Sequence, residues 1–107
     1  MLDSDIKEDL KNQEILPVFN TSELTADIKR LEIFLSKNSN IKNIEITLRK
    51  YNSLEIAIEL KKRFENINFG LGSILSREDY EIGSNEGFCF FVSPGIILDL
   101  VNTKVKN

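Results

Sequence analysis

The sequence has no histidine and only one cysteine, Cys89, and each scarcity excludes particular kinds of catalytic, metal or disulfide site. Without histidine, the common His-based catalytic sets and zinc sites are excluded, so we expect neither a metal ion nor another cofactor. One cysteine cannot form a disulfide within the chain. Cys89 lies in a continuous apolar run, residues 88–92, whose strand we expect to be buried on both faces. We therefore expect a buried, inert thiol in a reducing compartment.

Long apolar runs and a strong excess of one charge are also missing. No run approaches the roughly 18 apolar residues of a membrane span. The N-terminal segment, residues 1–5, is acidic and does not resemble a signal peptide. The formal net charge is −3, from 14 basic and 17 acidic residues, so nucleic acid and anionic membranes are not attracted in general. We therefore expect a cytoplasmic protein whose partners include neither nucleic acid nor a membrane.

The chain does contain enough apolar material for one small domain, since 41% of its 107 residues are hydrophobic. Helical and strand periodicities alternate along it, which predicts an α/β fold with a parallel sheet and right-handed crossovers. Either an open doubly wound sheet or part of a (β/α) barrel fits this order. The expected helices are residues 2–11, 22–37, 52–64, 76–83 and 96–101, and the expected strands are residues 15–19, 42–48, 67–72 and 87–92.

Capping signals accompany three of these helices. Thr21 or Ser22 can cap the helix that starts near residue 22. Asn52, in a capping-box pattern with Glu55, can cap the next helix, and Ser76 can cap the third.

The strongest functional signal is the strand at residues 44–49, Ile-Glu-Ile-Thr-Leu-Arg. The strand period places Glu45, Thr47 and Arg49 on the face opposite the apolar side chains. Helical patterns flank this strand, so both of its faces should be covered, and a covered carboxylate and guanidinium need each other or a ligand. The carboxyl end of a parallel strand is also where α/β folds bind substrates.

Other strand ends carry small or polar residues, at positions 19–20, 70–73 and 93–95. Each feature also has a purely structural interpretation. The glycines would allow a tight turn or close packing, Pro94 would end a strand, and Glu45 with Arg49 would form an internal ion pair. Because all of these features fall at one end of the sheet, together they favour a binding site.

Three segments resemble a known family: residues 45–49 (Glu-Ile-Thr-Leu-Arg), 70–73 (Gly-Leu-Gly-Ser) and 91–95 (Phe-Val-Ser-Pro-Gly). They are similar to the E-[VI]-T-[LM]-R, G-[AL]-G-T and V-S-P-G segments of the 2-keto-3-deoxy-6-phosphogluconate (KDPG) aldolases. These class I, Schiff-base enzymes also cleave 4-hydroxy-2-oxoglutarate. The resemblance extends from about residue 10 to 107. It implies a (β/α)8 TIM barrel, of which a lead-in helix and four parallel strand–helix units form the N-terminal half, and a homotrimer when complete.

The resemblance also implies roles for four residues. Glu45 would be the acid/base, Arg49 and Ser73 would bind the pyruvyl carboxylate of a 2-keto acid, and Pro94 would line the pocket beside the imine. A guanidinium is the natural bidentate partner of a carboxylate. The products would be pyruvate and glyceraldehyde 3-phosphate, or pyruvate and glyoxylate.

The Schiff-base lysine of the family lies on the sixth strand, beyond residue 107, and none of the ten lysines here fits its role. We therefore expect residues 1–107 to be one partial domain, a fragment that is inactive alone. The alternative is a self-contained, non-catalytic α/β module that binds a small carboxylate or a partner protein. Open edges at the first strand, blunted by Pro17, and at the apolar fourth strand predict self-association.

Overall fold

The computed structural model describes residues 12–13, 15–74 and 76–92 of the chain. Within these ranges, strands and helices alternate as predicted. The strands are β1 (Val18–Asn20), β2 (Asn43–Thr47), β3 (Asn68–Gly72) and β4 (Phe90–Val92), and the helices are α2 (Leu24–Lys37), α3 (Ser53–Arg63) and α4 (Arg77–Asn85). The predicted helices at residues 2–11 and 96–101 lie outside the described residues.

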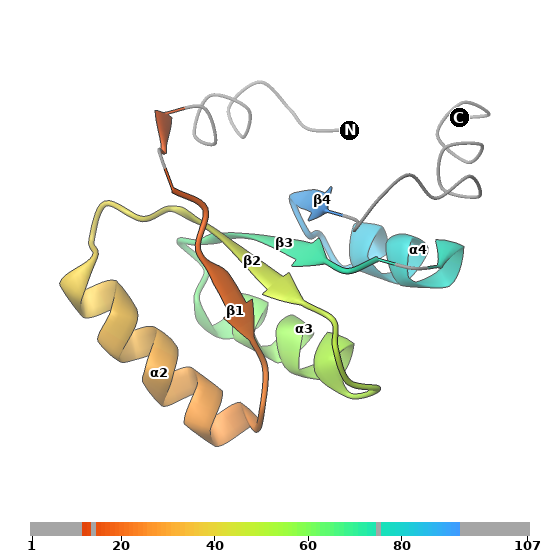
Figure 1. Cartoon of the computed structure of the whole chain (residues 1–107), viewed down its shortest axis with the longest axis horizontal. Helices are drawn as coiled ribbons and strands as arrows, with labels where there is room; N and C mark the ends of the chain where they lie inside the picture. Colours follow the sequence, from red (N-terminus) through yellow and green to blue (C-terminus); the bar gives the residue numbers. More distant parts are fainter. Residues whose placement is uncertain (1–11, 14, 75, 93–107) are drawn as a thin grey trace.

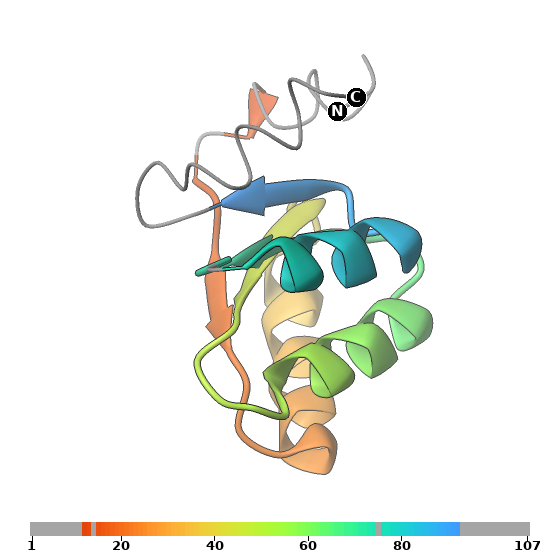
Figure 2. The same ribbon diagram turned by 90° about the vertical axis from the view of Figure 1, so that its right-hand side faces the viewer.

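The strands form one sheet in the order β1-β2-β3-β4, with every neighbouring pair parallel (Figure 1). Helices α2, α3 and α4 all lie on one side of the strands (Figure 2), as successive right-handed crossovers require. An open doubly wound sheet would instead reverse its strand order and carry helices on both sides. The predicted α/β fold, with the pattern of half a (β/α)8 barrel, is therefore confirmed.

The core lies between the sheet and the helices. The strand residues that point toward the helices are almost completely buried: Ile44, Ile46, Phe69 and Leu71. Buried residues of the helices belong to the same cluster: Leu31, Ile56, Ala57 and Leu60. Burial stabilises this cluster by about 25 cal/mol per Å² of apolar surface. A slip of one residue in β2 would turn its polar side chains into the core, so the apolar alternation determines the register.

The start of α2 differs from the prediction. The helix begins at Leu24 after Glu23, and no side chain makes a capping hydrogen bond there. Ser22 instead donates from its backbone N–H and from its hydroxyl to the carboxylate of Asp27, at 2.9 Å in both cases. The prediction of a cap at Thr21 or Ser22 is therefore wrong, because a carboxylate inside the helix binds the loop before it.

Of the other two predicted helix caps, the structure contradicts the one at Asn52 and confirms the one at Ser76. Asn52 precedes α3 as predicted, but its side chain makes no capping hydrogen bond. Ser76 precedes α4, and its hydroxyl accepts a hydrogen bond from the backbone N–H of Asp79 at 3.1 Å. Only the serine cap is therefore confirmed.

The last predicted strand begins later than expected. Gly87 has a φ of +86°, and its N–H donates to the carbonyl of Ser84 at 3.1 Å. The N–H of Phe88 donates to the carbonyl of Gly83 at 3.0 Å. This left-handed glycine thus ends α4 in the usual manner of a helix C-terminus, and residues 87–89 do not belong to β4.

Burial of the fourth strand is also less complete than predicted. Phe90 is buried, but Val92 is 38% exposed, so the expectation that both faces are covered is wrong for the described residues. Cys89 has intermediate exposure and is not fully buried as expected. No helix in the described part of the chain is long and apolar enough to cross a membrane.

Candidate functional site

The side of the sheet that faces away from the helices carries polar residues and glycine, and we call it the barrel face. Residues paired in parallel strands point the same way, so pairing arranges this face in rows. One row holds Val18, Glu45, Gly70 and Phe90, and the next holds Asn20, Thr47, Gly72 and Val92. In a complete barrel this side is the interior. The second row is closer to the carboxyl ends of the strands, where barrels bind their substrates.

Glu45 is buried on the barrel face, with 8% of its surface exposed. Its Oε2 accepts a hydrogen bond from Oγ1 of Thr47 at 3.0 Å, and Thr47 is 3% exposed. No cation of the described residues pairs with Glu45, so the alternative of an internal ion pair with Arg49 is wrong. Oε1 accepts no hydrogen bond from the described residues, which leaves this atom available to a ligand.

The glycines of β3 make room on the barrel face. A Cβ at Gly72 would overlap Oε2 of Glu45, and a Cβ at Gly70 would overlap the ring of Phe90. Both glycines lie inside the strand, and neither has a positive φ. A tight turn is therefore not the reason for glycine at these positions. What the site needs is the absence of a side chain, so that the Glu45 carboxylate can lie against the backbone of β3.

Ser73 follows β3 directly and has a φ of +59°, a conformation that is uncommon for residues other than glycine. The backbone is held on both sides of it. The carbonyl of Gly72 accepts from the N–H of Leu48 at 3.0 Å, and the N–H of Ile74 donates to the carbonyl of Val92 at 3.4 Å. Such strained residues concentrate at ligand sites, where the surrounding structure maintains them.

Arg49 lies just beyond the carboxyl end of β2, and its side chain extends toward β1. Its Nε donates to Oδ1 of Asn20 at 3.0 Å, and both residues are exposed. Asn20 is the last residue of β1 and pairs with Thr47. The guanidinium of Arg49 is thus held at the rim of the barrel face, just beyond the end of the strand that bears Glu45.

A buried carboxylate supports the end of β1. Arg30 Nη2 donates to Oδ1 of Asp27 at 2.7 Å and to the carbonyl oxygen of Asn20 at 2.8 Å, and its guanidinium lies 4.3 Å from the ring centroid of Phe19. Burial raises the pKa of Asp27. The hydrogen bonds from Arg30 and Ser22, and the charge of Arg30, lower it by more, so the pKa falls below its ordinary value of 3.8. The ionised carboxylate therefore anchors Arg30 at neutral pH.

At the opposite end of the sheet, polar groups bind one another. Oε1 of Gln13 accepts hydrogen bonds from the backbone N–H groups of Lys42 and Asn43, both at 3.0 Å, and from Nδ2 of Asn43 at 3.1 Å. Asn68 donates to Oδ1 of Asn43 at 3.0 Å. These amides stabilise the amino ends of the strands. In a barrel, residues at this end usually contribute to stability and not to ligand binding.

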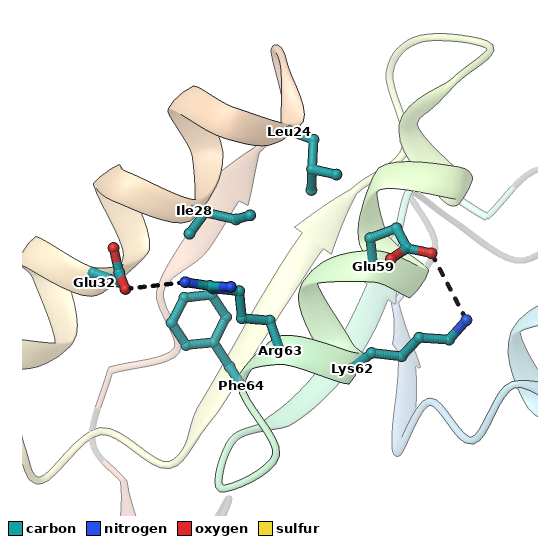
Figure 3. Close-up of a pocket in the computed structure, with 7 residues that line it drawn as sticks. All are labelled: Leu24, Ile28, Glu32, Glu59, Lys62, Arg63 and Phe64. Atoms are coloured by element: carbon teal, nitrogen blue, oxygen red, sulfur yellow. Dashed lines mark ion pairs between the residues drawn. The ribbon is translucent and has the colours of Figure 1, made fainter.

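A surface groove between α2 and α3 lies on the helix side of the sheet (Figure 3). It is lined by Leu24, Ile28, Glu32, Glu59, Lys62, Arg63 and Phe64. The charges there are engaged in two ion pairs, Arg63 with Glu32 and Lys62 with Glu59, each at 3.7 Å. None of the predicted site residues lines this groove, so it is separate from the candidate site.

Three of the four predicted site residues lie on the barrel face or at its rim. Glu45 and Arg49 come from β2 and its end, and Ser73 follows the adjacent strand β3. Pro94 lies outside the described residues. Sequence reasoning did not assign roles to Thr47 and Asn20, although the strand period placed the first beside Glu45 and the second ends a strand. No group of three or more acidic, cysteine or histidine side chains that could hold a metal ion occurs among the described residues.

The family model described as KDPG and KHG aldolase matches residues 6–107, which is most of the chain. The matched range includes the strands of the barrel face and the predicted position 94. A comparison with curated proteins found no match to this chain.

Proposed function

The chain belongs to the KDPG and KHG aldolase family, and from that premise we propose that it carries the proton-transfer and carboxylate-binding half of a class I aldolase site. The reaction is the cleavage of KDPG to pyruvate and glyceraldehyde 3-phosphate, of 4-hydroxy-2-oxoglutarate to pyruvate and glyoxylate, or both. The observation that supports it most is the buried carboxylate of Glu45, which Thr47 orients and Gly72 accommodates.

In our proposal Glu45 moves the protons of the reaction. A lysine amine first condenses with the C2 carbonyl of the substrate, and water leaves. Glu45 then accepts the proton of the C4 hydroxyl while the C3–C4 bond breaks and its electrons move toward the imine nitrogen. The aldehyde departs, Glu45 returns a proton to C3, and hydrolysis releases pyruvate. We assign these transfers to Oε1, because Oε2 is engaged with Thr47.

Arg49 and Ser73 bind the C1 carboxylate of the substrate in this proposal. A guanidinium offers two parallel N–H donors to a carboxylate, and Arg49 lies just beyond the end of the strand that bears Glu45. Ser73 contributes a hydroxyl from the end of β3, where its left-handed backbone is held by neighbouring strands. Pro94 would line the pocket beside the imine, by its resemblance to the family motif.

We propose that a segment outside residues 1–107 supplies the Schiff-base lysine. An amine reacts in this way when it lies in a pocket shielded from water. Of the six lysines among the described residues, five are exposed, and the sixth, Lys61, lies on α3 behind the sheet. Residues 1–107 would then form one partial domain. By its resemblance to the family, the complete enzyme would be a cytoplasmic homotrimer.

One experiment tests where the lysine lies. The chain is incubated with pyruvate and sodium borohydride, which reduces any imine to a stable amine, and its mass is measured. We expect no adduct on the chain alone. A stoichiometric adduct on any of its lysines would contradict the assignment of the nucleophile to another segment.

A second experiment tests Glu45. Residues 1–107 are fused to the fifth to eighth strand–helix units of a complete aldolase of this family, and cleavage is followed by pyruvate release. We expect the fusion to be active. Glu45→Gln should decrease its kcat by a factor of about 10² to 10⁴. Glu65→Gln, which changes an exposed loop residue, is the matched control. A folded fusion without activity, or an active Glu45→Gln variant, would refute the proposed function.

A further inference from the structure

The hydrogen bond between Arg49 and Asn20 restricts how Arg49 can meet a carboxylate. A guanidinium has five N–H donors in a rigid fork, and two of its edges can bind a carboxylate through parallel hydrogen bonds. One edge uses Nε and one terminal nitrogen, and the other uses both terminal nitrogens. Nε already donates to Oδ1 of Asn20 at 3.0 Å. The terminal nitrogens donate to no other described residue.

We propose that Asn20 is a positioning residue that presents the two terminal nitrogens of Arg49 to the C1 carboxylate of a 2-keto acid. This inference rests on the proposed function. A carboxylate that approached the Nε edge would have to displace Asn20. The open edge is therefore the one formed by both terminal nitrogens, and it receives the ligand without breaking a hydrogen bond of the protein.

Asn20 is itself well anchored, which makes it suitable for this role. Its backbone pairs with Thr47 across β1 and β2, and its carbonyl oxygen accepts from Arg30 at 2.8 Å. Arg30 is fixed by the buried Asp27 at 2.7 Å and by the ring of Phe19. A long arginine side chain loses rotamer freedom when it binds a ligand. Asn20 restrains this freedom before the ligand arrives, so less is lost on binding.

The amide of Asn20 is also chemically suited to this position. Its oxygen is a neutral acceptor, so it orients the guanidinium without neutralising the charge that attracts a carboxylate. An aspartate has the same shape but would form an ion pair with Arg49 and compete with the ligand. The neutral asparagine and the charged aspartate should therefore differ strongly in ligand affinity.

The test uses the full chain labelled with ¹⁵N and the side-chain Nε–Hε signal of Arg49, identified as the signal that Arg49→Lys removes. Each variant is titrated with pyruvate. We expect Asn20→Ala to raise the Kd for pyruvate about threefold to tenfold, as loss of roughly one hydrogen bond predicts. Asn20→Asp should raise it more than about tenfold. Asn66→Ala, at an exposed loop asparagine, should leave it unchanged.

A second readout separates positioning from a general structural role. The Hε proton of Arg49 should exchange with water faster in Asn20→Ala than in the unaltered chain, while circular dichroism remains the same. If Asn20→Ala unfolds, the isosteric Asn20→Asp variant provides the test. Either variant binding pyruvate as tightly as the unaltered chain would overturn the inference.

The outcomes also distinguish this inference from the proposed function. If Arg49→Lys abolishes pyruvate binding and both Asn20 variants bind normally, the inference fails and the proposed function stands. If the unaltered chain binds no pyruvate, or Arg49→Lys has no effect, then the assignment of Arg49 to the carboxylate fails and the inference fails with it.

Discussion

The carboxylate of Glu45 occupies the space that a side chain at Gly72 would need. These two residues lie on adjacent strands, β2 and β3, and on the same side of the sheet. The glycine therefore belongs to the proposed acid/base site as much as the glutamate does, because it allows Oε2 to lie against the backbone while Thr47 donates to it.

Gly72→Ala should destabilise the chain and displace the Glu45 carboxylate, because a new Cβ would overlap Oε2. We expect a loss of about 1–3 kcal/mol in the free energy of unfolding, the usual cost of overpacking, measured by urea denaturation. The same substitution in a Glu45→Ala background should cost much less, because the overlapping group is gone. An equal cost in both backgrounds would show that the two residues do not interfere.

Thr47→Val keeps the shape of the side chain and removes the hydroxyl that donates to Glu45. We expect a loss of about 1–2 kcal/mol in stability, because a buried charged acceptor loses its partner. In the active fusion it should lower kcat, though less than Glu45→Gln does. Thr25→Val, on the exposed surface of α2, is the control. Unchanged stability and kcat for Thr47→Val would contradict the role assigned to this hydroxyl.

Asp27→Asn should change how stability depends on pH. The pKa of Asp27 is below its ordinary value of 3.8 in the folded chain, so its ionised form stabilises the fold above that pH. This contribution is lost as pH falls below 3.8 and through the folded-state pKa. We expect Asp27→Asn to lower the free energy of unfolding by about 1–2 kcal/mol at pH 7, a modest loss because the side chain of Arg30 is half exposed. The variant should then lose less stability than the unaltered chain when the pH is lowered. Parallel curves of stability against pH would refute this.

Ser76→Ala should remove the only side-chain cap seen among α2, α3 and α4. The backbone N–H of Asp79 would lose its acceptor, and we expect a decrease of about 1 kcal/mol in the free energy of unfolding. Ser39→Ala, in an exposed loop, should have little effect. The two variants can be compared by thermal and urea denaturation, and equal stabilities would argue against capping by Ser76.

Val18→Lys should reduce self-association of the isolated chain. Val18 lies on the barrel face with 54% of its surface exposed, and β1 pairs with only one strand within the described residues. Lysine on such an edge opposes pairing with another copy. Ile33→Lys, on the surface of α2 and 57% exposed, is the matched control. Light scattering at increasing concentration measures the effect. A monodisperse monomer of the unaltered chain would remove the basis for this prediction.

The apolar sequence of the fourth strand also suggests lysine at position 90 or 91, but either substitution would be a less specific test of association than Val18→Lys. Phe90 is buried beside Gly70, and the ring centroid of Phe91 lies 4.8 Å from that of Tyr80. Lysine at either position would disturb the core as well as the edge. A change in solubility would then not report on association alone.

The local sequence was sufficient to predict the alternation of strands and helices. Apolar residues recur with the period of each element, and this period follows from the geometry of the backbone alone. The same pattern placed Glu45 on the face opposite Ile44 and Ile46, and it placed Arg49 and Ser73 at strand ends. The fold class and the family are therefore accessible from short segments and their order.

Only the tertiary structure decided which side chains meet. Arg49 lies beyond the end of β2, and its side chain binds Asn20 of β1 and not Glu45. Their partners, Thr47 and Asn20, are determined by neighbouring positions and by the register between β1 and β2. The need for glycine at position 72 likewise arises from a carboxylate on another strand. Contacts between strands depend on register and on side-chain reach, which the local periodicity of a sequence does not contain.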